Sequence, residues 1–474
     1  MAVRTDHGRV VALRPSDLAR LRRAAEQAVR RARGRGGEAL AAITVPLAAD
    51  VDPASVAVAS RRSGEPWFCF EQPDRDRAAL AALGCVRALE GSGAERFSRV
   101  AREWRSLAAE ASGDAGEHLV AVGGFAFASS GGDAPDWAGF EPASLHVPEA
   151  ALLRRGGEVS VTLAALATPD DTAEDLVARV ERRAAELRTA PLPLLDPDPA
   201  GVTRVVSTMP PEHYEAAVAS AVERIRGGAL EKVVLAREVE VHAPAPHDAA
   251  AVFAVLREAF PSCFVFCAGR GDAAFVAASP ELLVRREGLR ASSLALAGST
   301  RRSADPAVDD HLGEQLLQST KDRGEQRIVS ERILRTLEPH AVWTTAAPEP
   351  VIVKVENIQH LATPIRAQLA SPVPAVELAG VLHPTPAVGG EPFDRAAPLI
   401  PALEGLDRGW YAGPVGWTDA NQDGEFCVAL RCALLRGRVA RCYAGVGVVA
   451  DSDPAAELAE TEIKLAALLP VLAG

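Results

Sequence analysis

Two pairs of carboxylates, far apart in the sequence, have the spacing of residues that share one face of a helix. Glu457 and Glu460 lie three residues apart, and Lys464 follows four residues after Glu460. Asp322 and Glu325 repeat the three-residue spacing upstream. Side chains at these spacings meet on one side of a helix. Each pair alone is also typical of a solvated salt-bridge face. Two pairs that face each other would supply the oxygen ligands that Mg²⁺ prefers, with positions left for substrate and water.

The C-terminal pair lies on a helix that the sequence predicts from Pro454 to the end of the chain. Asp453 is a good N-cap, and Pro454 suits the first helical position because its missing N–H would have no partner there. Leu458 and Ile463 continue the apolar spacing of a helix. The upstream pair lies on a second predicted helix, which spans residues 315–338.

A lysine and a glutamate in the second half of the chain are candidates for acid–base chemistry. A predicted strand, 231–241, places Lys232 on a largely apolar face. The lysine there either snorkels to the surface or is a buried amine that can act as a general base. Glu281 follows a predicted strand and Pro280. It is either a desolvated general acid or a glutamate in the first turn of a helix, where it would complement the helix dipole.

Further segments of the second half could contact a ligand. A predicted strand ends at Gly298 and Ser299, where free backbone N–H groups could hold a carboxylate. His383 opens a proline-rich loop, either as a ligand-contacting group or as a turn residue. The glycine-rich strand predicted at 409–417 can approach a ligand closely.

A hairpin is predicted from the strands 425–435 and 439–450. Arg431 lies in its first strand, and Gly445 and Gly447 lie in its second. These glycines do not indicate a Rossmann fold, because no third glycine follows and the segment is an antiparallel hairpin.

Composition limits the possible partners and compartment. The chain has 474 residues, of which 48% are hydrophobic and 24% charged, which is typical of a globular protein with ample core. The net charge of −12 argues against a nucleic-acid partner. No apolar stretch approaches the roughly 20 residues of a membrane span, and the N-terminus lacks a secretory signal. Seven cysteines lack metal-ligand spacing. We therefore expect a cytoplasmic protein with reduced thiols and no membrane partner.

Strands and helices are predicted on both sides of a proline-rich connector at 192–199. Because antiparallel strands are expected before and after it, the sequence predicts one continuous α+β body. The half before the connector contains no catalytic constellation. No amphipathic surface is left over, so we expect a monomer.

Eight short motifs follow one another in the second half. They are Lys-Val-Val-Leu-Ala-Arg (232–237), Ser-Pro-Glu-Leu-Leu (279–283), Ala-Gly-Ser (297–299), Lys-Asp-Arg-Gly-Glu (321–325), His-Pro-Thr-Pro-Ala-Val-Gly-Gly (383–390), Gly-Trp-Tyr-Ala-Gly-Pro-Val-Gly (409–416), Leu-Arg-Cys-Ala (430–433) and Glu-Thr-Glu-Ile-Lys (460–464). In this order they resemble the chorismate-utilising enzymes, and within them the isochorismate synthases. The resemblance covers residues 200–470, and residues 1–190 resemble the variable N-terminal part of the same fold. It implies a single large domain, 1–474, with two mostly antiparallel β-sheets packed together and helices on the outside.

The resemblance also implies the reaction and its residues. Water would add at ring C2 of chorismate and the C4 hydroxyl would leave, with Lys232 as general base and Glu281 as general acid. The cofactor would be Mg²⁺, ligated by Glu325 and Glu460 and supported, directly or through water, by Asp322 and Glu457. The residues implied to hold the substrate are Gly298, Ser299, His383, Tyr411, Arg431, Gly445 and Lys464.

Differences from related enzymes select among the family's reactions. Anthranilate and aminodeoxychorismate synthases typically have Gln where Lys232 stands, and the latter carry Lys where this chain has Ala297. Salicylate synthases share the lysine but usually differ in the 383–390 loop, so the resemblance favours release of isochorismate, with salicylate formation as the alternative.

Most relatives have His where this chain has Gln326, and a protein that binds chorismate without turning it over is a further alternative. Menaquinone and catechol siderophore routes both start from isochorismate, and the motifs favour neither.

Overall fold

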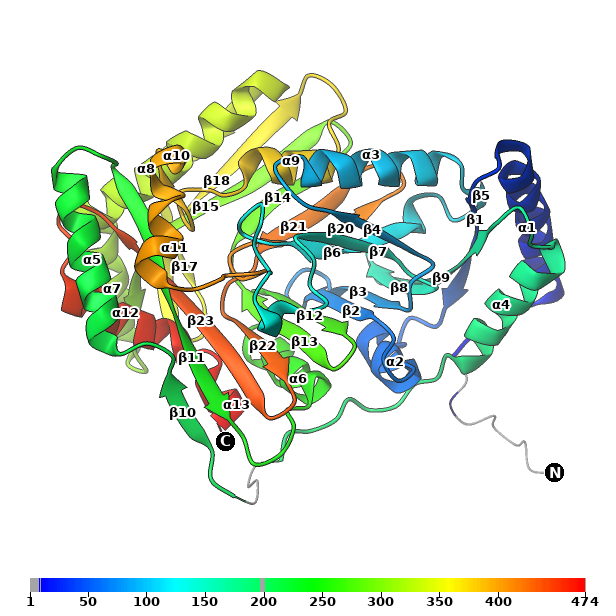
Figure 1. The fold of residues 1–474 in the computed structure, drawn as a ribbon, viewed down its shortest axis with the longest axis horizontal. Coiled ribbons are helices and arrows are strands. Elements are labelled where there is room, and N and C mark those ends of the chain that lie inside the picture. The colour runs from blue at the N-terminus through cyan, green and yellow to red at the C-terminus, as the bar shows by residue number, and fades with distance from the viewer. Residues whose placement is uncertain (1–7, 9, 197–200, 474) are drawn as a thin grey trace.

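The apolar stretches of the chain form strands, and these strands assemble into two large sheets with helices on the outside (Figure 1). The computed structural model describes residues 8, 10–196 and 201–473. The first sheet has 13 strands in the order β10-β11-β23-β22-β13-β12-β2-β3-β8-β9-β1-β5, with β19 paired to β11. The second has 10 strands in the order β16-β18-β15-β14-β21-β20-β6-β7-β4, with β17 paired to β18. Among the described residues, neighbouring strands pair antiparallel except β1 with β5.

The strands of the first sheet are β1 (Ala39–Leu47), β2 (Trp67–Gln72), β3 (Ala78–Leu83), β5 (Ser112–Gly113), β8 (Ala150–Arg155), β9 (Glu158–Ala167), β10 (Arg204–Ser207), β11 (Lys232–His242), β12 (Phe264–Arg270), β13 (Ala273–Ser279), β19 (Gly390–Glu391), β22 (Cys432–Arg436) and β23 (Val439–Val448). Those of the second are β4 (Arg87–Gly91), β6 (Val120–Phe125), β7 (Ala143–Val147), β14 (Leu282–Glu287), β15 (Arg290–Arg301), β16 (Ala341–Ala346), β17 (Val351–Lys354), β18 (Ile358–Leu369), β20 (Pro414–Asp419) and β21 (Gly424–Val428).

The α-helices are α1 (Pro15–Arg35), α2 (Pro53–Ser60), α3 (Arg96–Ala109), α4 (Ala173–Glu186), α5 (Pro211–Arg226), α6 (Ala249–Ala259), α7 (Pro306–Gln318), α8 (Thr320–Leu337), α9 (Ala375–Leu382), α10 (Phe393–Ala396), α11 (Leu399–Glu404), α12 (Pro454–Leu465) and α13 (Leu469–Ala473). Three short 3₁₀ helices are η1 (Gly116–His118), η2 (Pro135–Trp137) and η3 (Glu338–His340). Within the described ranges, no helix combines the length and apolarity needed to cross a membrane.

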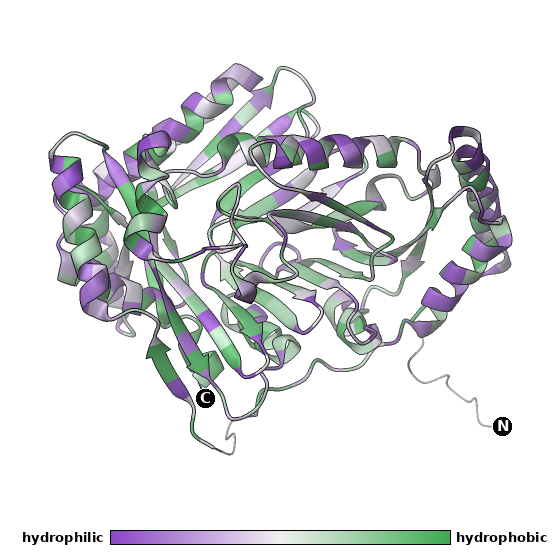
Figure 2. Ribbon diagram, viewed as in Figure 1, coloured by the Kyte–Doolittle hydropathy of each residue, from purple (hydrophilic) through white to green (hydrophobic). Residues whose placement is uncertain are grey.

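The two sheets share one apolar core. Phe266 of the first sheet and Phe125 and Phe426 of the second are fully buried in the same cluster of contacting side chains. Strands are largely apolar, whereas the outer helices carry hydrophilic faces (Figure 2). The predicted α+β fold of two mostly antiparallel sheets packed together is therefore confirmed.

Both sheets contain strands from before and after the connector. In the first sheet β2 pairs with β12, and in the second β6 pairs with β20. Of the predicted connector, 192–196 forms neither helix nor strand, and 197–199 lies outside the described residues. All seven cysteines are free thiols, six of them buried.

Two predicted helices are interrupted. The prediction of one helix over 315–338 is wrong, because Ser319 ends α7 and caps α8 by accepting a hydrogen bond from the Asp322 N–H (3.3 Å). The prediction of an unbroken C-terminal helix is also wrong, because α12 ends at Leu465 and α13 follows. Pro470 explains this break, since proline inside a helix removes an N–H donor and clashes with the preceding turn.

The predicted strand 425–435 is in fact two strands in different sheets. β21 belongs to the second sheet and β22 to the first. Arg431 lies between them with a φ of 49°, in the left-handed region that a strand residue does not adopt. The predicted strand 409–417 likewise begins only at Pro414, and Tyr411 lies in the turn before it. The predicted hairpin is confirmed, and its strands are β22 and β23.

Candidate active site

One cavity collects most of the predicted site residues. Its walls come from β11, β15, β18, β23, the start of α8 and the middle of α12, and its empty volume is about 610 Å³. The predicted residues that line it are Glu281, Gly298, Ser299, Glu325, Tyr411, Arg431, Gly445, Glu460 and Lys464. Residues that are separated by up to 183 positions in the sequence, from Glu281 to Lys464, therefore meet at one place.

Lys232 does not line the cavity itself but is fully buried behind Glu325 and Gly447, which do. Its Nζ is 2.8 Å from Oε1 of Glu325, whose side chain is 11% exposed. The pair needs Gly447, since a Cβ there would lie 2.1 Å from that oxygen and 2.7 Å from Cε of Lys232. Because the whole side chain is buried, the snorkelling interpretation of Lys232 is wrong. The structure instead holds an amine and a carboxylate together at the cavity wall.

Glu281 is the second buried ionisable group of the cavity. It lies between β13 and β14, so it is not in the first turn of a helix. Burial raises the pKa of Glu281 to about 8, and the positive charges of Lys232 and Arg431 only partly oppose this rise. The carboxyl is therefore largely protonated at neutral pH, as a general acid must be.

Glu460 is the cavity carboxylate of the C-terminal helix. Its Oε1 accepts a hydrogen bond from the Ser299 hydroxyl (2.7 Å) and is 2.8 Å from Nζ of Lys464. Burial alone would raise the pKa of Glu460, but Lys464 and Ser299 lower it below its ordinary value. Glu460 is therefore a charged carboxylate that faces the same cavity as Glu325.

The partners of these carboxylates, Asp322 and Glu457, do not line the cavity. Glu457 is buried and ion-pairs with Nζ of Lys321 (2.7 Å), while Asp322 accepts a hydrogen bond from the Ser319 hydroxyl. Burial raises the pKa of both carboxyls. Among the described residues, no three His, Cys, Asp or Glu side chains are close enough to form a metal site by themselves. Of the four predicted metal ligands, Glu325 and Glu460 line the cavity.

Positive charge in the cavity comes from Arg431 and Lys464. The Nη2 of Arg431 is 3.1 Å from Nε2 of His360, and Nζ of Lys464 donates to the Gly445 carbonyl (2.9 Å). Burial and the nearby Arg431 lower the pKa of His360 well below its ordinary value, so this histidine is neutral and can accept the hydrogen bond. His360 could not be predicted from the sequence, because a single histidine in an apolar strand carries no spacing signal.

Two glycines predicted to hold the substrate are needed for close packing. A Cβ at Gly298, whose φ is 73°, would lie 2.9 Å from Cβ of Asp322. A Cβ at Gly445 would lie 2.7 Å from the Tyr411 hydroxyl. At both positions a side chain would therefore clash with its neighbours, and both glycines line the cavity.

His383 is not brought to the cavity. Its Nε2 lies 2.9 Å from the Phe127 carbonyl, and its ring packs between Phe97 and Phe127. Burial lowers its pKa to about 3. The same loop reaches the cavity through Ala387 and Val388 instead.

Gln326, beside the ligand candidate Glu325, points away from the cavity. Its Nε2 donates to the Ala295 carbonyl and to Oγ1 of Thr363, each at 2.9 Å. These bonds fasten α8 to β15 and β18.

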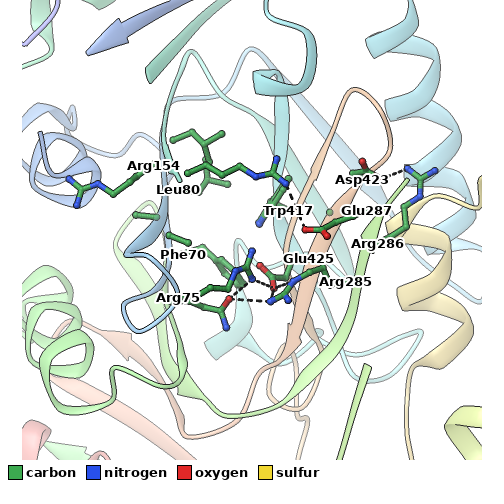
Figure 3. A pocket seen from close by; sticks show the side chains of 16 residues that line it. Phe70, Arg75, Leu80, Arg154, Arg285, Arg286, Glu287, Trp417, Asp423 and Glu425 are labelled. Atoms are coloured by element: carbon green, nitrogen blue, oxygen red, sulfur yellow. Dashed lines mark hydrogen bonds and ion pairs between the residues drawn. The ribbon is translucent and has the colours of Figure 1, made fainter. Parts of the chain in front are cut away.

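A second cavity lies between the sheets and contains none of the predicted residues (Figure 3). Phe70, Leu80 and Trp417 form apolar parts of its lining. Its carboxylates are neutralised by arginines: Glu425 lies 2.7 Å from Arg75, and Asp423 lies 2.6 Å from Arg286. Its lining contains no lysine, whereas Lys464 lines the first cavity and Lys232 lies behind it, so the first cavity is the candidate active site.

Comparisons with known proteins agree with this assignment. The family model described as chorismate binding enzyme matches residues 25–473. The salicylate biosynthesis isochorismate synthase of Pseudomonas aeruginosa is 37% identical over 424 residues, which cover 90% of this chain and 88% of that protein. The isochorismate synthase MenF of Bacillus subtilis is 32% identical over 355 residues, which cover 75% of each protein.

Solved structures share the fold. The menaquinone-specific isochorismate synthase MenF from Escherichia coli has a TM-score of 0.78 and 29% identity, covering 91% of this chain and 94% of that one. Anthranilate synthase component I from Streptococcus pneumoniae has a TM-score of 0.60 at 21% identity, covering 73% of this chain and 79% of that one, which shows a common fold alone. The family model spans nearly the whole chain and agrees with the fold and the cavity. The chain therefore belongs to the chorismate binding enzyme family.

Proposed function

We propose that this protein is an isochorismate synthase, which converts chorismate to isochorismate by adding water at C2 and releasing the C4 hydroxyl. The observation that carries the proposal is a cavity lined by a buried protonated carboxyl, Glu281, with a buried amine, Lys232, directly behind its lining residue Glu325. The names of the relatives, which include isochorismate synthases 37% and 32% identical to this chain, support the same reaction.

The proposed step is a balanced exchange of hydroxyl groups. As general base, the amine of Lys232 takes a proton from water as the water oxygen bonds to C2. The ring double bonds shift, the C4–O bond breaks, and Glu281 protonates the departing hydroxyl so that it leaves as water. Such acid–base pairs work when each group is held in the protonation state that its task needs. Burial supports that state for Glu281.

The remaining cavity residues would bind the substrate. Arg431 and Lys464 supply the positive charges that an anionic substrate needs in a protein with a net charge of −12. Backbone N–H groups around Gly298 and Gly445 would complete the carboxylate contacts.

The chemistry of the cavity also suits a divalent cation. Mg²⁺ takes one or two protein carboxylates and keeps other positions for water and substrate oxygens, and the carboxylates that line the cavity are Glu281, Glu325 and Glu460. We propose that Glu325 and Glu460 hold Mg²⁺, with Asp322 and Glu457 behind them, while Glu281 keeps its proton. When bound, the ion would neutralise charge at the ring carboxylate of the substrate.

A product assay tests this function. Purified protein is incubated with chorismate and Mg²⁺, and the products are separated by chromatography, with an EDTA control. We expect isochorismate, its loss in EDTA and its return with excess Mg²⁺. Salicylate with pyruvate would favour the salicylate-forming alternative, and chorismate that binds but is not converted would favour a binding protein.

A further inference from the structure

A fully buried ion pair lies directly behind one wall of the active-site cavity. Arg408 donates from Nη2 to Oε1 of Glu404 (2.5 Å) and from Nε to Oε2 (3.0 Å). The side chains are 3% and 1% exposed, and neither lines the cavity. The pair therefore does not face the substrate and can influence it only through neighbouring residues.

The pair binds two backbone segments that do line the cavity. Arg408 donates from Nη1 to the Val388 carbonyl (2.8 Å) and from Nη2 to the Val234 carbonyl (2.9 Å). Oε1 of Glu404 also accepts the N–H of Ala236 (2.7 Å). Val234 and Val388 are both cavity-lining residues. One guanidinium thus fastens β11, the strand of Lys232, to the loop before β19.

A third wall residue packs on the same guanidinium. Arg408 lies 4.2 Å from the ring centre of Phe127 and 5.7 Å from that of Tyr411. Tyr411 lines the cavity, and Phe127 accepts the hydrogen bond of His383 from the same loop. The contacts of Arg408 therefore converge on one side of the cavity.

Stability alone does not explain this pair. A buried ion pair gains little over apolar residues of similar volume, because desolvation offsets the attraction. Its hydrogen bonds, however, fix neighbours with a planar, five-donor geometry that apolar residues and lysine lack. Resting on the function proposed above, we propose that Arg408, held by Glu404, is a positioning residue that fixes the substrate-binding wall formed by Val234, Val388 and Tyr411.

The test compares Arg408→Lys with a matched buried arginine elsewhere. Lysine keeps the charge beside Glu404 but cannot reach both carbonyls at once. The wall then shifts, while Lys232 keeps its ion pair with Glu325 and Glu281 keeps its position between β13 and β14. We expect KM for chorismate to rise at least about tenfold and kcat to fall by less, since misplaced binding groups remote from the chemistry weaken productive binding.

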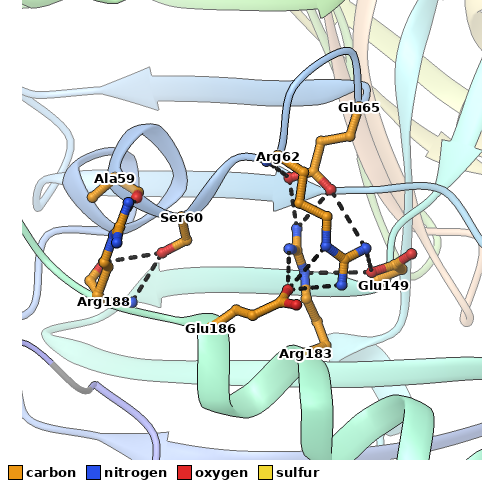
Figure 4. A network of polar contacts seen from close by, with 8 residues as sticks. All are labelled: Ala59, Ser60, Arg62, Glu65, Glu149, Arg183, Glu186 and Arg188. Atoms are coloured by element: carbon orange, nitrogen blue, oxygen red, sulfur yellow. Dashed lines mark hydrogen bonds and ion pairs between the residues drawn. The ribbon is translucent and has the colours of Figure 1, made fainter.

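Arg183→Lys is the control (Figure 4). Arg183 is also buried, and it ion-pairs with Glu65 (3.0 Å), Glu186 (3.1 Å) and Glu149 (3.5 Å). It lies on α4, at the opposite end of the molecule from α12 (Figure 1). This variant should lower the thermal midpoint as Arg408→Lys does, yet leave KM and kcat at their wild-type values.

Glu404→Gln provides a second variant should Arg408→Lys fail to fold. The amide oxygen can still accept the Ala236 N–H, but the charge that holds Arg408 is gone, so KM should rise in the same direction. The inference is overturned when the folded Arg408 or Glu404 variant loses stability like Arg183→Lys and keeps the wild-type KM and kcat.

Calorimetric measurement of chorismate binding in EDTA separates this inference from the proposed function. If Arg408→Lys binds chorismate more weakly than wild type and Arg183→Lys does not, the positioning role of Arg408 is supported even where the wild-type protein forms no isochorismate.

Discussion

At the scale of single residues, Glu281 lines the cavity and Lys232 lies behind the lining residue Glu325, so the two groups have different electrostatic surroundings. The Nζ of Lys232 lies 2.8 Å from Glu325, whereas burial raises the pKa of Glu281 to about 8. The sequence predicted both residue types and both roles. It could not predict the pairing of Lys232 with Glu325, because that contact depends on how β11 packs against α8.

The first prediction concerns the base. Lys232→Ala should abolish water addition, a loss of roughly 10²–10⁴-fold for a missing acid–base group. Chorismate binding in the presence of Mg²⁺ should stay measurable by calorimetry, because Arg431 and Lys464 remain. Near-normal turnover by the folded variant would remove Lys232 from the base role.

The second prediction concerns the pH dependence of turnover. Because the protonated form of Glu281 is the proposed acid, kcat should fall as pH rises through about 8, the pKa of this carboxyl. Glu281→Gln should be strongly impaired at all pH values and lose this alkaline limb. A wild-type profile that stays flat well above this pKa would contradict the assignment.

The same shift predicts a pH dependence of stability. The folded-state pKa of Glu281 is raised from 4.5 to about 8, so its contribution to stability is fully present below 4.5 and is lost as pH rises to 8. Relative to wild type, the Tm of Glu281→Gln should therefore rise as pH increases across this window. A difference in Tm that does not change with pH would show that the carboxyl titrates normally.

At the scale of elements, capped helix starts bring the carboxylates to the site. The Asp453 carboxylate accepts the Ala456 N–H (2.9 Å) at the start of α12, as the sequence predicted. Ser319 does the same for α8, but the sequence pattern does not reveal this cap because apolar spacing continues across it. Arg431 was placed in a strand for a similar reason, since its left-handed backbone has no signature in residue type.

The third prediction compares two glutamates on α12. Glu460→Gln should weaken Mg²⁺-dependent activity far more than it lowers Tm, because Glu460 faces the cavity. Glu462→Gln is the control, since its side chain is 57% exposed and pairs with Arg237. Equal losses of activity and stability in Glu460→Gln would favour a structural role for this residue.

The fourth prediction concerns the cap of α8. Ser319→Ala should lower the free energy of unfolding by about 1 kcal/mol, the usual loss for an N-cap hydroxyl. Ser330→Ala, within the same helix, should leave stability unchanged or raise it slightly, because alanine is the better helix former. Urea unfolding curves measure both, and equal effects would argue against the cap.

At the scale of the whole molecule, the site exists only because two sheets and their helices meet. Its lining comes from β11 and β23 of the first sheet and from β15 and β18 of the second. Periodicity predicted most of these strands, and the resemblance predicted the two-sheet fold. Pairings such as β2 with β12 join residues about 200 positions apart, and no local pattern encodes them. The expectation of a monomer remains a prediction.

Charge is distributed unevenly over the molecule. The chain carries a net charge of −12, yet its cavity contains Arg431 and Lys464, with Lys232 behind them. This arrangement suits a small anionic substrate, since local cations can bind an anion that the rest of the surface repels.

The most direct test of the proposed reaction is an isotope measurement. Wild-type protein converts chorismate in H₂¹⁸O with Mg²⁺, and mass spectrometry locates the label in the product. We predict isochorismate with one ¹⁸O, carried by the new C2 hydroxyl, because that oxygen comes from the water that Lys232 activates. Isochorismate without label would mean that the hydroxyl migrates within the substrate, and would contradict the roles given to Lys232 and Glu281.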